Sequence, residues 1–295
     1  MIDLHIHTNH SDGTDSVEEL LKNAEAKKLE IISITDHDSV GAYYELEKKP
    51  ELRKLFNGKI IIGSEFKTCY KRVPIEILGY GIDYKKIRIH EVDDEKMQKK
   101  ILDQMKQVAN KLGLKYDEDS TYIDRNDLTK QWAAFVMGTE LLKYEENNNI
   151  IKEIGEFTPT SFFRVHQSNF DSPFYADETS DSIEINELIS RIHEAGGFAF
   201  LAHGYIYPFK NKDEVIEEIL STTQIDGMEC IYTDFSEEER KKAYNLCKKY
   251  NKYMSGGTDY HAKNKPNIDL GSGENNNIKI EKEFIKTWEN KVRYI

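Results

Sequence analysis

The first residues of the chain alternate apolar and polar side chains with the period of an extended strand. Aliphatic residues occupy positions 2, 4 and 6, and the opposite face carries Asp3, His5 and His7. The pattern predicts a half-buried strand on which two imidazoles project side by side, a spacing from which both can bind one cation. Two histidines on a strand more often form an ordinary polar edge, so the metal interpretation depends on the residues at the ends of the other strands.

The same patterning predicts alternating strands and helices over most of the chain. The predicted strands are 30–35, 59–63, 74–80, 198–202, 227–232 and 253–257, and the predicted helices are 16–28, 41–56, 183–195, 213–220 and 237–250. Ser16 and Glu19 form a capping-box pattern at the start of the first helix. Alternation of strands with helices implies parallel pairing and an α/β fold, in which active groups gather at the carboxyl ends of the strands.

The alternation is interrupted between residues 90 and 178, where the sequence becomes mostly helical and rich in charge. We therefore expect two parts, a domain formed by 1–89 and 179–295 and a helical insertion at 90–178. A lid or substrate-specificity domain and a plain structural appendage are both compatible with such an insertion.

Within the insertion, helices are predicted at 92–112, with Gly113 as the stop, and at 127–143. The segment 157–177 is expected to be irregular and aromatic. Beyond the insertion, the end of the chain is expected to form a short strand and a last helix at 282–291.

The composition indicates an acidic globular protein, with 295 residues, 38% hydrophobic residues and a formal net charge of −12. This charge disfavours binding of a long nucleic acid, but it leaves a phosphate ester substrate open because bound divalent metals reverse the local field. The three cysteines, Cys69, Cys230 and Cys247, contain no C-x-x-C pair and fit a reducing compartment. The sequence shows no apolar run of about 18 residues and no signal-peptide pattern, so we expect a cytoplasmic protein without a membrane partner.

Further metal-type ligands follow or lie within one predicted strand after another. Together with the first pair, the candidate metal ligands are His5, His7, Asp12, His37, Glu65, Glu76, His203, Asp259 and His261. Imidazole nitrogen and carboxylate oxygen without thiolate suit Zn, Mn or Fe, whereas Mg and Ca prefer all-oxygen shells. A catalytic metal takes three to four protein ligands, so this set predicts two or three divalent ions.

The remaining histidines and the basic residues have weaker signals. His10 and His90 are expected to be solvated, and His193 to favour a helix C-terminus. Arg164 and His166, in the irregular segment, are candidates to bind a substrate phosphate. Lower-ranked candidates for the same role are Lys67, Lys71 and Arg72.

Two more groups of residues have both a functional and a structural interpretation. Asp36 and Asp38 flank His37 and could orient imidazoles, or they could simply form the turn. The aromatic residues of the insertion could stack on a base or form a small core; these are Phe162, Phe163, Phe170, Phe174 and Tyr175.

The chain resembles the PHP (polymerase and histidinol phosphatase) superfamily, most closely the stand-alone PHP phosphoesterases that act on nucleotides. The matching segments are 3–8, 11–14, 35–39 with Gly41, 63–65, 77–80, 195–203 and 256–261. The resemblance covers about 1–88 and 180–275 and is weak across the insertion.

The resemblance implies a distorted (β/α)7 barrel, the PHP fold, with a trinuclear metal centre at the carboxyl ends of its strands. All candidate ligands except Glu76 match ligand positions of the family, and Glu65 resembles the bridging ligand. Family members usually have His where this chain has Glu76. The added negative charge would favour Mn, Fe or Mg over Zn at that position, or would mean that one metal is lost.

The reaction expected from these residues is hydrolysis of a phosphate ester by metal-bound hydroxide. The expected substrates are nucleoside mono- or 3',5'-bisphosphates or short oligonucleotides, with His203, Asp259 and His261 as candidate catalytic residues. Two alternatives stay open: a phosphatase for histidinol phosphate or another small phosphomonoester, and a catalytically weakened metal-binding regulatory module, which only Glu76 favours. The oligomeric state is not indicated.

Overall fold

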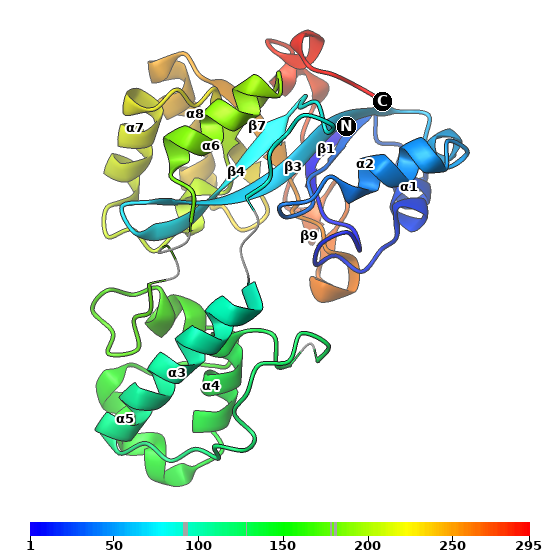
Figure 1. Ribbon diagram of the computed structural model, residues 1–295. Helices are drawn as coiled ribbons and strands as arrows, with labels where there is room; N and C mark the ends of the chain where they lie inside the picture. Colours follow the sequence, from blue (N-terminus) through cyan, green and yellow to red (C-terminus); the bar gives the residue numbers. More distant parts are fainter. Residues whose placement is uncertain (91–93, 128, 178, 180–181) are drawn as a thin grey trace. The chain divides into compact units, whose positions relative to one another are not determined.

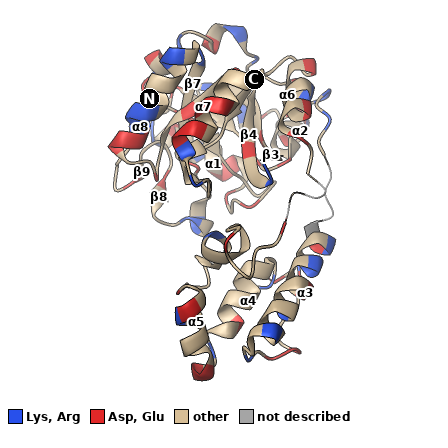
Figure 2. Cartoon of the chain, turned by 90° about the vertical axis from the view of Figure 1, so that its left-hand side faces the viewer, with Lys and Arg blue, Asp and Glu red and all other residues tan. Residues whose placement is uncertain are grey.

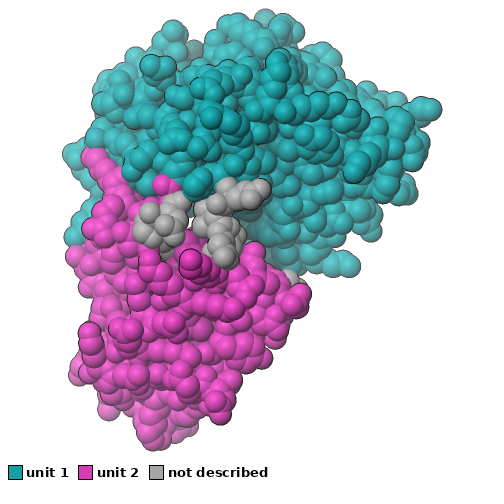
Figure 3. All heavy atoms as spheres, viewed as in Figure 1, with its two compact units in different colours: residues 1–70, 74–90, 183–295 teal, residues 71–73, 91–182 magenta. Residues whose placement is uncertain are grey.

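The computed structural model describes residues 1–90, 94–127, 129–177, 179 and 182–295. The chain divides into two compact units (Figure 3). Unit 1 consists of 1–70, 74–90 and 183–295, and unit 2 consists of 71–73 and 91–182. Each unit has its own buried apolar cluster. No described helix is both long and apolar enough to span a lipid bilayer.

Unit 1 is built on a seven-stranded sheet with the strand order β1-β2-β3-β4-β5-β6-β7 (Figure 1). The strands are β1 (Ile2–Ile6), β2 (Ile31–Ile34), β3 (Lys59–Tyr70), β4 (Val73–Tyr80), β5 (Phe198–Leu201), β6 (Gly227–Tyr232) and β7 (Tyr253–Gly257). β1 to β3 pair in parallel, as do β5 to β7, whereas β4 is antiparallel to β5. The predicted α/β class is confirmed, and the antiparallel β4 interrupts the parallel pairing that alternation had implied.

The two edges of this sheet meet, so that it forms a nearly closed barrel. The backbone N–H of His7 donates to the carbonyl oxygen of Tyr260 at 2.9 Å, which joins the end of β1 to the segment after β7. Gly257 permits this approach, because a Cβ atom at that position would lie 2.2 Å from the Cβ of His5.

Helices cover the sheet from outside (Figure 1). Those of unit 1 are α1 (Val17–Ala26), α2 (Gly41–Lys48), α6 (Ile185–Glu194), α7 (Lys212–Thr222) and α8 (Glu237–Tyr250). Ser16 and Ser236 cap α1 and α8 through capping boxes with the glutamate three residues on, which confirms the predicted start of the first helix. α7 carries mostly acidic residues, whereas α8 has three glutamates in its first turn and basic residues after them (Figure 2), as expected for solvated helix faces.

The buried cluster of unit 1 lies toward the amino ends of the strands. It contains Ile2 and Ile31, the first residues of β1 and β2, together with Ile285 and Trp288 from the end of the chain. The Trp288 Nε1–H donates to the carbonyl oxygen of Met254 at 2.9 Å. The terminal segment therefore fills the end of the barrel opposite to the carboxyl ends of the strands.

Unit 2 is helical, with α3 (Asp94–Leu112), α4 (Ala133–Leu141) and α5 (Asn148–Ile154), followed by a π-helical turn at Phe163–Gln167. Gly113 follows α3 with a φ of +71°, as predicted for a helix stop. The predicted start of α3 at residue 92 lies outside the described residues.

The structure corrects several predicted elements, and buried polar residues explain two of the errors. β1 is buried on both faces, because the residues of its predicted polar face have buried partners instead of solvent. Asp3 accepts hydrogen bonds from the N–H groups of Thr258 and Gly271, and His5 lies beside Glu65. β3 does not end at Gly63 but continues to Tyr70, and its polar residue Glu65 is completely buried.

Some predicted helix ends were wrong, because a nearby proline or a side-chain hydrogen bond to the backbone disfavours the helix there. α2 ends at Lys48 because Pro50 follows and disfavours a helical residue before it. α4 begins at Ala133 and not at Asp127, whose side chain accepts a bond from the Thr129 N–H at 2.9 Å. The predicted last helix is instead two short 3-10 turns, Lys282–Ile285 and Glu289–Lys291.

Candidate metal centre

The nine candidate ligands, although spread from residue 5 to residue 261, converge at the carboxyl ends of the barrel strands within unit 1. His5 lies in β1, and Glu65 and Glu76 lie in the interiors of β3 and β4. The others lie in the loops that follow strands, namely His7, Asp12, His37, His203, Asp259 and His261. Parallel strands bring these loops together at one end, so the convergence is a consequence of the fold.

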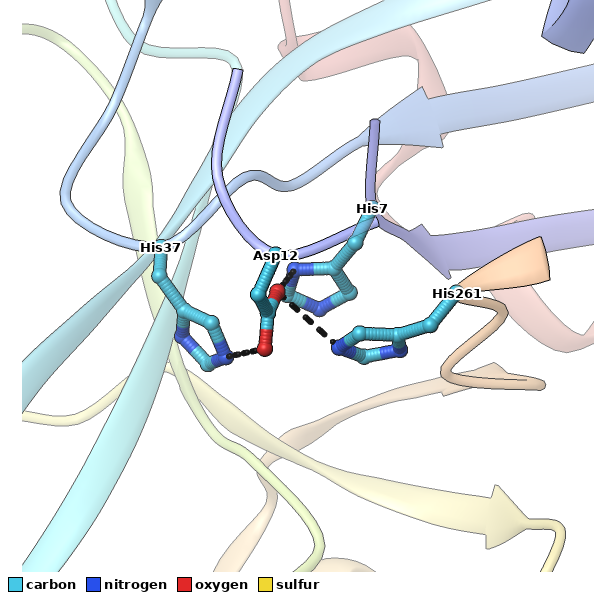
Figure 4. A group of neighbouring side chains, drawn as sticks. All are labelled: His7, Asp12, His37 and His261. Atoms are coloured by element: carbon cyan, nitrogen blue, oxygen red, sulfur yellow. Dashed lines mark ion pairs between the residues drawn. The ribbon is translucent and has the colours of Figure 1, made fainter. Parts of the chain in front are cut away.

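The first group of ligand atoms belongs to His7, Asp12, His37 and His261 (Figure 4). Each of the four residues offers one ligand atom, and these four atoms lie within 4.8 Å of one another. Asp12 is the centre of the group: its Oδ1 lies 3.1 Å from His261 Nε2 and 3.5 Å from His7 Nδ1. Its Oδ2 lies 3.8 Å from His37 Nε2. The Asp12 side chain is half exposed, so this group is open to solvent.

The second group, formed by His5, His7, Glu65 and Asp259, is completely buried or nearly so. Glu65 Oε2 lies 3.0 Å from His5 Nε2 and 3.2 Å from His7 Nε2. Asp259 Oδ1 lies 3.3 Å from His7 Nε2. His7 therefore presents one ring nitrogen to each of the first two groups.

The third group consists of His37, Glu65 and Glu76. His37 Nδ1 lies 3.3 Å from Glu65 and 3.5 Å from Glu76. His203 Nε2 lies beside the same carboxylates, 3.0 Å from Glu65 Oε1 and 3.4 Å from Glu76 Oε2. The two oxygens of Glu65 thus face four imidazoles, which is the arrangement required of a bridging carboxylate.

Several of these atoms have the surroundings of metal ligands. Among the residues that the structure describes, His7 Nε2, His37 Nδ1 and Glu65 Oε1 are buried and have no hydrogen-bond partner. A buried polar atom without a partner is costly, and a cation between these atoms would satisfy all of them. The residues present therefore fit a site for more than one metal ion.

The PHP domain family model matches residues 3–236. The chain belongs to the PHP family. A phosphoribosyl 1,2-cyclic phosphate 1,2-diphosphodiesterase of Eggerthella lenta is 22% identical over 265 residues, covering 88% of this chain and 94% of that protein. A 3',5'-nucleoside bisphosphate phosphatase of Chromobacterium violaceum is 23% identical over 279 residues, covering 92% and 91%.

A 5'-3' exoribonuclease of Haemophilus influenzae is 24% identical over 267 residues, covering 88% of this chain and 89% of that protein. A crystal structure from Bifidobacterium adolescentis superposes with a TM-score of 0.64 at 19% identity, covering 99% of this chain and 96% of that one. The chain is thus a PHP-family metal-dependent phosphoesterase, a hydrolase with the PHP barrel fold, as the sequence predicted.

Burial and neighbouring charges raise the pKa of some residues of this PHP centre and lower the pKa of others. Burial alone would lower the pKa of His7, but the neighbouring carboxylates of Asp259 and Glu65 raise it to about 9. His37 is dominated by burial, which lowers its pKa to about 3. Burial and the negative charge of Glu65 raise the pKa of Glu76 to about 7. Without cations, protons on imidazoles therefore balance part of the carboxylate charge.

Two of the candidate ligands hold strained backbone conformations. His203 has a φ of +24° and Asp259 a φ of +59°, in a region that residues with a Cβ rarely adopt. Such outliers persist only where surrounding contacts enforce them, and they cluster at functional sites. The strain turns both side chains toward the centre directly after β5 and β7.

Sequence reasoning missed three residues that support the ligands. Glu229, in β6, is completely buried and lies 3.2 Å from His5 Nδ1. The hydroxyl of Tyr232 donates to Asp259 Oδ2 at 2.8 Å, and Lys265 pairs with the same oxygen. A signal for Glu229 existed, because it is a charged residue inside a predicted apolar strand.

The acidic neighbours of His37 both accept hydrogen bonds from other segments of the chain. Asp36 accepts hydrogen bonds of 2.7 Å from the N–H and the hydroxyl of Thr8 and from the Ser11 hydroxyl. Asp38 accepts a bond of 3.2 Å from the Lys67 N–H. Asp36 therefore holds the loop after β1 in place.

The remaining histidines have structural partners. His10 is partly buried and lies 2.8 Å from Glu45, so its predicted solvation was wrong. His193, near the end of α6, lies 2.7 Å from Asp226. In unit 2, His166 is buried between the Ser172 hydroxyl at 2.8 Å and the Gly155 carbonyl at 3.0 Å.

The substrate-binding candidates of the insertion lie in unit 2, with different exposures. Arg164 is exposed and His166 is buried, so only Arg164 is accessible to a ligand, and its role as a substrate contact stays a prediction. The aromatic residues divide in the same way: Phe162 and Phe174 are buried in the cluster of unit 2, and Phe163 and Phe170 are exposed.

Proposed function

We propose that this PHP phosphoesterase hydrolyses a phosphate ester of a nucleotide, with three divalent cations held by the three overlapping ligand groups. The observation that carries this proposal is the sharing of ligands. His7 belongs to the first and second groups, Glu65 to the second and third, and His37 to the first and third. Sharing of this kind would hold cations close enough to act on one phosphate group.

Two of the ligands have distinct parts in this proposal. Glu65 would bridge two cations, because its Oε2 faces His5 and His7 and its Oε1 faces His203. The partly exposed Asp12 is on the open side, where a phosphate can enter. When bound, the cations supply Lewis-acid activation of water and charge neutralisation at the phosphate oxygens.

Of the candidate acids, His261 is poorly suited to protonate a leaving group. Its Nδ1 lies 2.8 Å from the backbone carbonyl of Asp259, and its Nε2 faces Asp12. The carbonyl fixes the proton on Nδ1 and leaves the Nε2 lone pair for a cation. His203 Nδ1 is buried without a hydrogen-bond partner among the described residues, so no contact fixes the proton of this ring on one nitrogen.

The metal set that we propose is Mn or Fe, with Zn less favoured at the Glu76 position. Glu76 places a second carboxylate beside Glu65, and hard or borderline cations prefer such oxygen-rich surroundings. The uncompensated charge is large enough that burial and Glu65 already raise the pKa of Glu76 to about 7. A cation at this position would relieve the repulsion.

The names of three relatives support a nucleotide as the substrate. These names give a phosphoribosyl cyclic phosphate, a nucleoside bisphosphate and RNA as their substrates, and all of these are phosphorylated ribose compounds. In unit 2, the exposed Arg164 and the Phe170–Tyr175 stack, with ring centroids 4.6 Å apart, offer a phosphate fork and an aromatic surface. These suit a substrate with a base.

The test is a substrate panel with the Mn²⁺-, Fe²⁺- and Zn²⁺-loaded full chain. The panel contains nucleoside 3',5'-bisphosphates, 5'-mononucleotides, short oligoribonucleotides, a phosphoribosyl cyclic phosphate and histidinol phosphate. We expect the highest kcat/KM for a substrate that carries a base. Preference for histidinol phosphate would replace the nucleotide assignment by the small-phosphomonoester alternative.

Arg164→Gln tests the contribution of unit 2, with Lys152→Gln, an exposed change in α5, as the matched control. We expect Arg164→Gln to raise KM for nucleotides and to leave kcat unchanged, because a bidentate phosphate contact would be lost. Equal kinetics of the two variants would remove Arg164 from the substrate site.

A further inference from the structure

We infer that Glu229 is a positioning residue of the metal centre: one buried carboxylate that orients the imidazole of His5 and fixes the backbone of His203. This inference rests on the proposed ligand set. Glu229 is not one of the grouped ligand atoms, and its role follows from where its two oxygens lie relative to two ligands from opposite parts of the chain.

The first contact fixes the ring of His5. Glu229 Oε1 and Oε2 lie 3.2 and 3.4 Å from Nδ1 of His5, while the other ring nitrogen, Nε2, lies 3.0 Å from Glu65. A carboxylate behind Nδ1 holds the proton there, so that Nε2 presents its lone pair to a cation. The same contact also fixes the rotation of the ring.

The second contact supports a strained backbone. The N–H of His203 donates to Glu229 Oε2 at 2.9 Å, and His203 has a φ of +24°. The Cβ of a residue makes this conformation unfavourable, and a charge-assisted hydrogen bond to its N–H offsets part of the cost. Glu229 therefore contributes to directing the His203 side chain toward Glu65 and Glu76.

The cost of burying Glu229 agrees with this role. Its side chain is completely inaccessible, in the middle of β6 between Met228 and Cys230, which are buried as well. A carboxylate in such surroundings is destabilising unless it is hydrogen-bonded to a donor that compensates for lost water. The donors that the structure shows for it are the His5 ring and the His203 N–H, and both belong to proposed ligands.

The chain contains a matched control for this carboxylate. Asp226, just before β6, also binds one imidazole and one backbone N–H: its Oδ2 lies 2.7 Å from His193 Nε2 and accepts from the Ala199 N–H at 2.8 Å. His193 is not among the ligand groups. Glu229→Gln and Asp226→Asn therefore remove the same kind of interaction, in one case behind a proposed ligand and in the other away from the centre.

The experiment measures Mn²⁺ affinity and stoichiometry of the full chain by chelator competition and elemental analysis, without any substrate. We expect Glu229→Gln to weaken Mn²⁺ binding about 10- to 100-fold, the usual range for groups that orient metal ligands. Asp226→Asn should keep the affinity of the unchanged protein. At saturating Mn²⁺, Glu229→Gln should regain most of its kcat with an unchanged KM.

Two results would overturn the inference. One is a folded Glu229→Gln protein, judged by circular dichroism and thermal unfolding, that binds Mn²⁺ with undiminished affinity. The other is an equal loss of affinity in Asp226→Asn. If Glu229→Gln does not fold, Glu229→Asp retains the charge with a shorter reach, and a folded Glu229→Asp with undiminished affinity would also refute the role. Absence of nucleotide turnover would refute the proposed substrate and leave this affinity measurement intact.

Discussion

The backbone N–H of Asp259 donates a 2.9 Å hydrogen bond to the carbonyl oxygen of His5, and the Asp259 carboxylate lies 3.5 Å from Nε2 of the same histidine. One pair of residues thus joins the two edges of the barrel and supplies two of the candidate ligands. Closure of the sheet and assembly of the metal centre are therefore the same structural event in this chain.

Gly257→Ala tests this coupling. The new Cβ would lie 2.2 Å from the Cβ of His5, so β7 and β1 must separate. Overpacking of this kind typically costs about 1–3 kcal/mol, and we expect at least the upper end because backbone atoms are involved. Urea unfolding measures the stability, and elemental analysis should show fewer metal ions per chain because Asp259 moves with β7.

Gly113→Ala is the control for Gly257→Ala, because it adds a Cβ to a glycine that has no close neighbours among the described residues. Gly113 has a φ of +71°, and a Cβ there would meet no atom within 4 Å among the described residues. The left-handed conformation alone costs roughly 1–2 kcal/mol, with no loss of metal. Equal metal contents of the two variants would contradict the coupling between barrel closure and metal binding.

Glu65→Gln tests the bridging role. The carboxylate meets His5 Nε2 at 3.0 Å through Oε2 and His203 Nε2 at 3.0 Å through Oε1. Because an amide has a single weakly charged oxygen, we expect loss of metal from both groups that contain Glu65 and a fall in kcat/KM of more than about 100-fold, beyond the range for orienting groups. A variant with full metal occupancy would show that Glu65 is not a bridge.

The sequence was sufficient to predict the α/β class, because the apolar pattern of the strands and helices is local, and the resemblance supplied the barrel. Strands β6 and β7 and helix α8 were predicted with the bounds that the structure shows, since each has an apolar period and clear ends. The candidate ligands were predicted because they lie in or after strands, and the structure brings their side chains together.

What the sequence could not show depends on contacts between distant residues. Glu65 was predicted to follow a strand, and β1 was predicted to be half-buried. Both errors arise because the apolar pattern of a strand does not show that its polar residues are buried. Glu229 lies 3.2 Å from a ring in β1, a contact that no spacing within β6 indicates. The burial of His166 likewise follows from tertiary packing with Ser172 and Gly155.

Glu76→His tests the candidate ligand at which the chain departs from the resemblance. Glu76 lies beside Glu65 in the third group, and their repulsion contributes to its raised pKa of about 7. A neutral imidazole removes that repulsion and adds a nitrogen ligand, so we expect a shift in preference toward Zn²⁺. Competition between Mn²⁺ and Zn²⁺, followed by elemental analysis, gives the ratio. An unchanged ratio would mean that Glu76 does not select the metal.

The last prediction concerns pH and lies outside the metal centre. The hydrogen bond to Asp226, 2.7 Å from His193 Nε2, raises the pKa of His193, although partial burial opposes the shift. A raised folded-state pKa means that the pair stabilises the protein fully below the unfolded pKa of about 6.5, and that this contribution disappears as the pH rises through the folded-state value. The His193 side chain is one-third exposed, so the contribution should stay within about 1 kcal/mol.

His193→Gln is the suitable variant, because it leaves the bond from the Ala199 N–H to Asp226 in place. Urea unfolding at about pH 5.5 and about pH 9 should show a larger loss of stability at the lower pH, where the imidazole of the unchanged protein is charged in the folded state. Equal losses at the two pH values would mean that the pair acts as a neutral hydrogen bond. A larger loss at the higher pH would reverse the sign and exclude a raised pKa for His193.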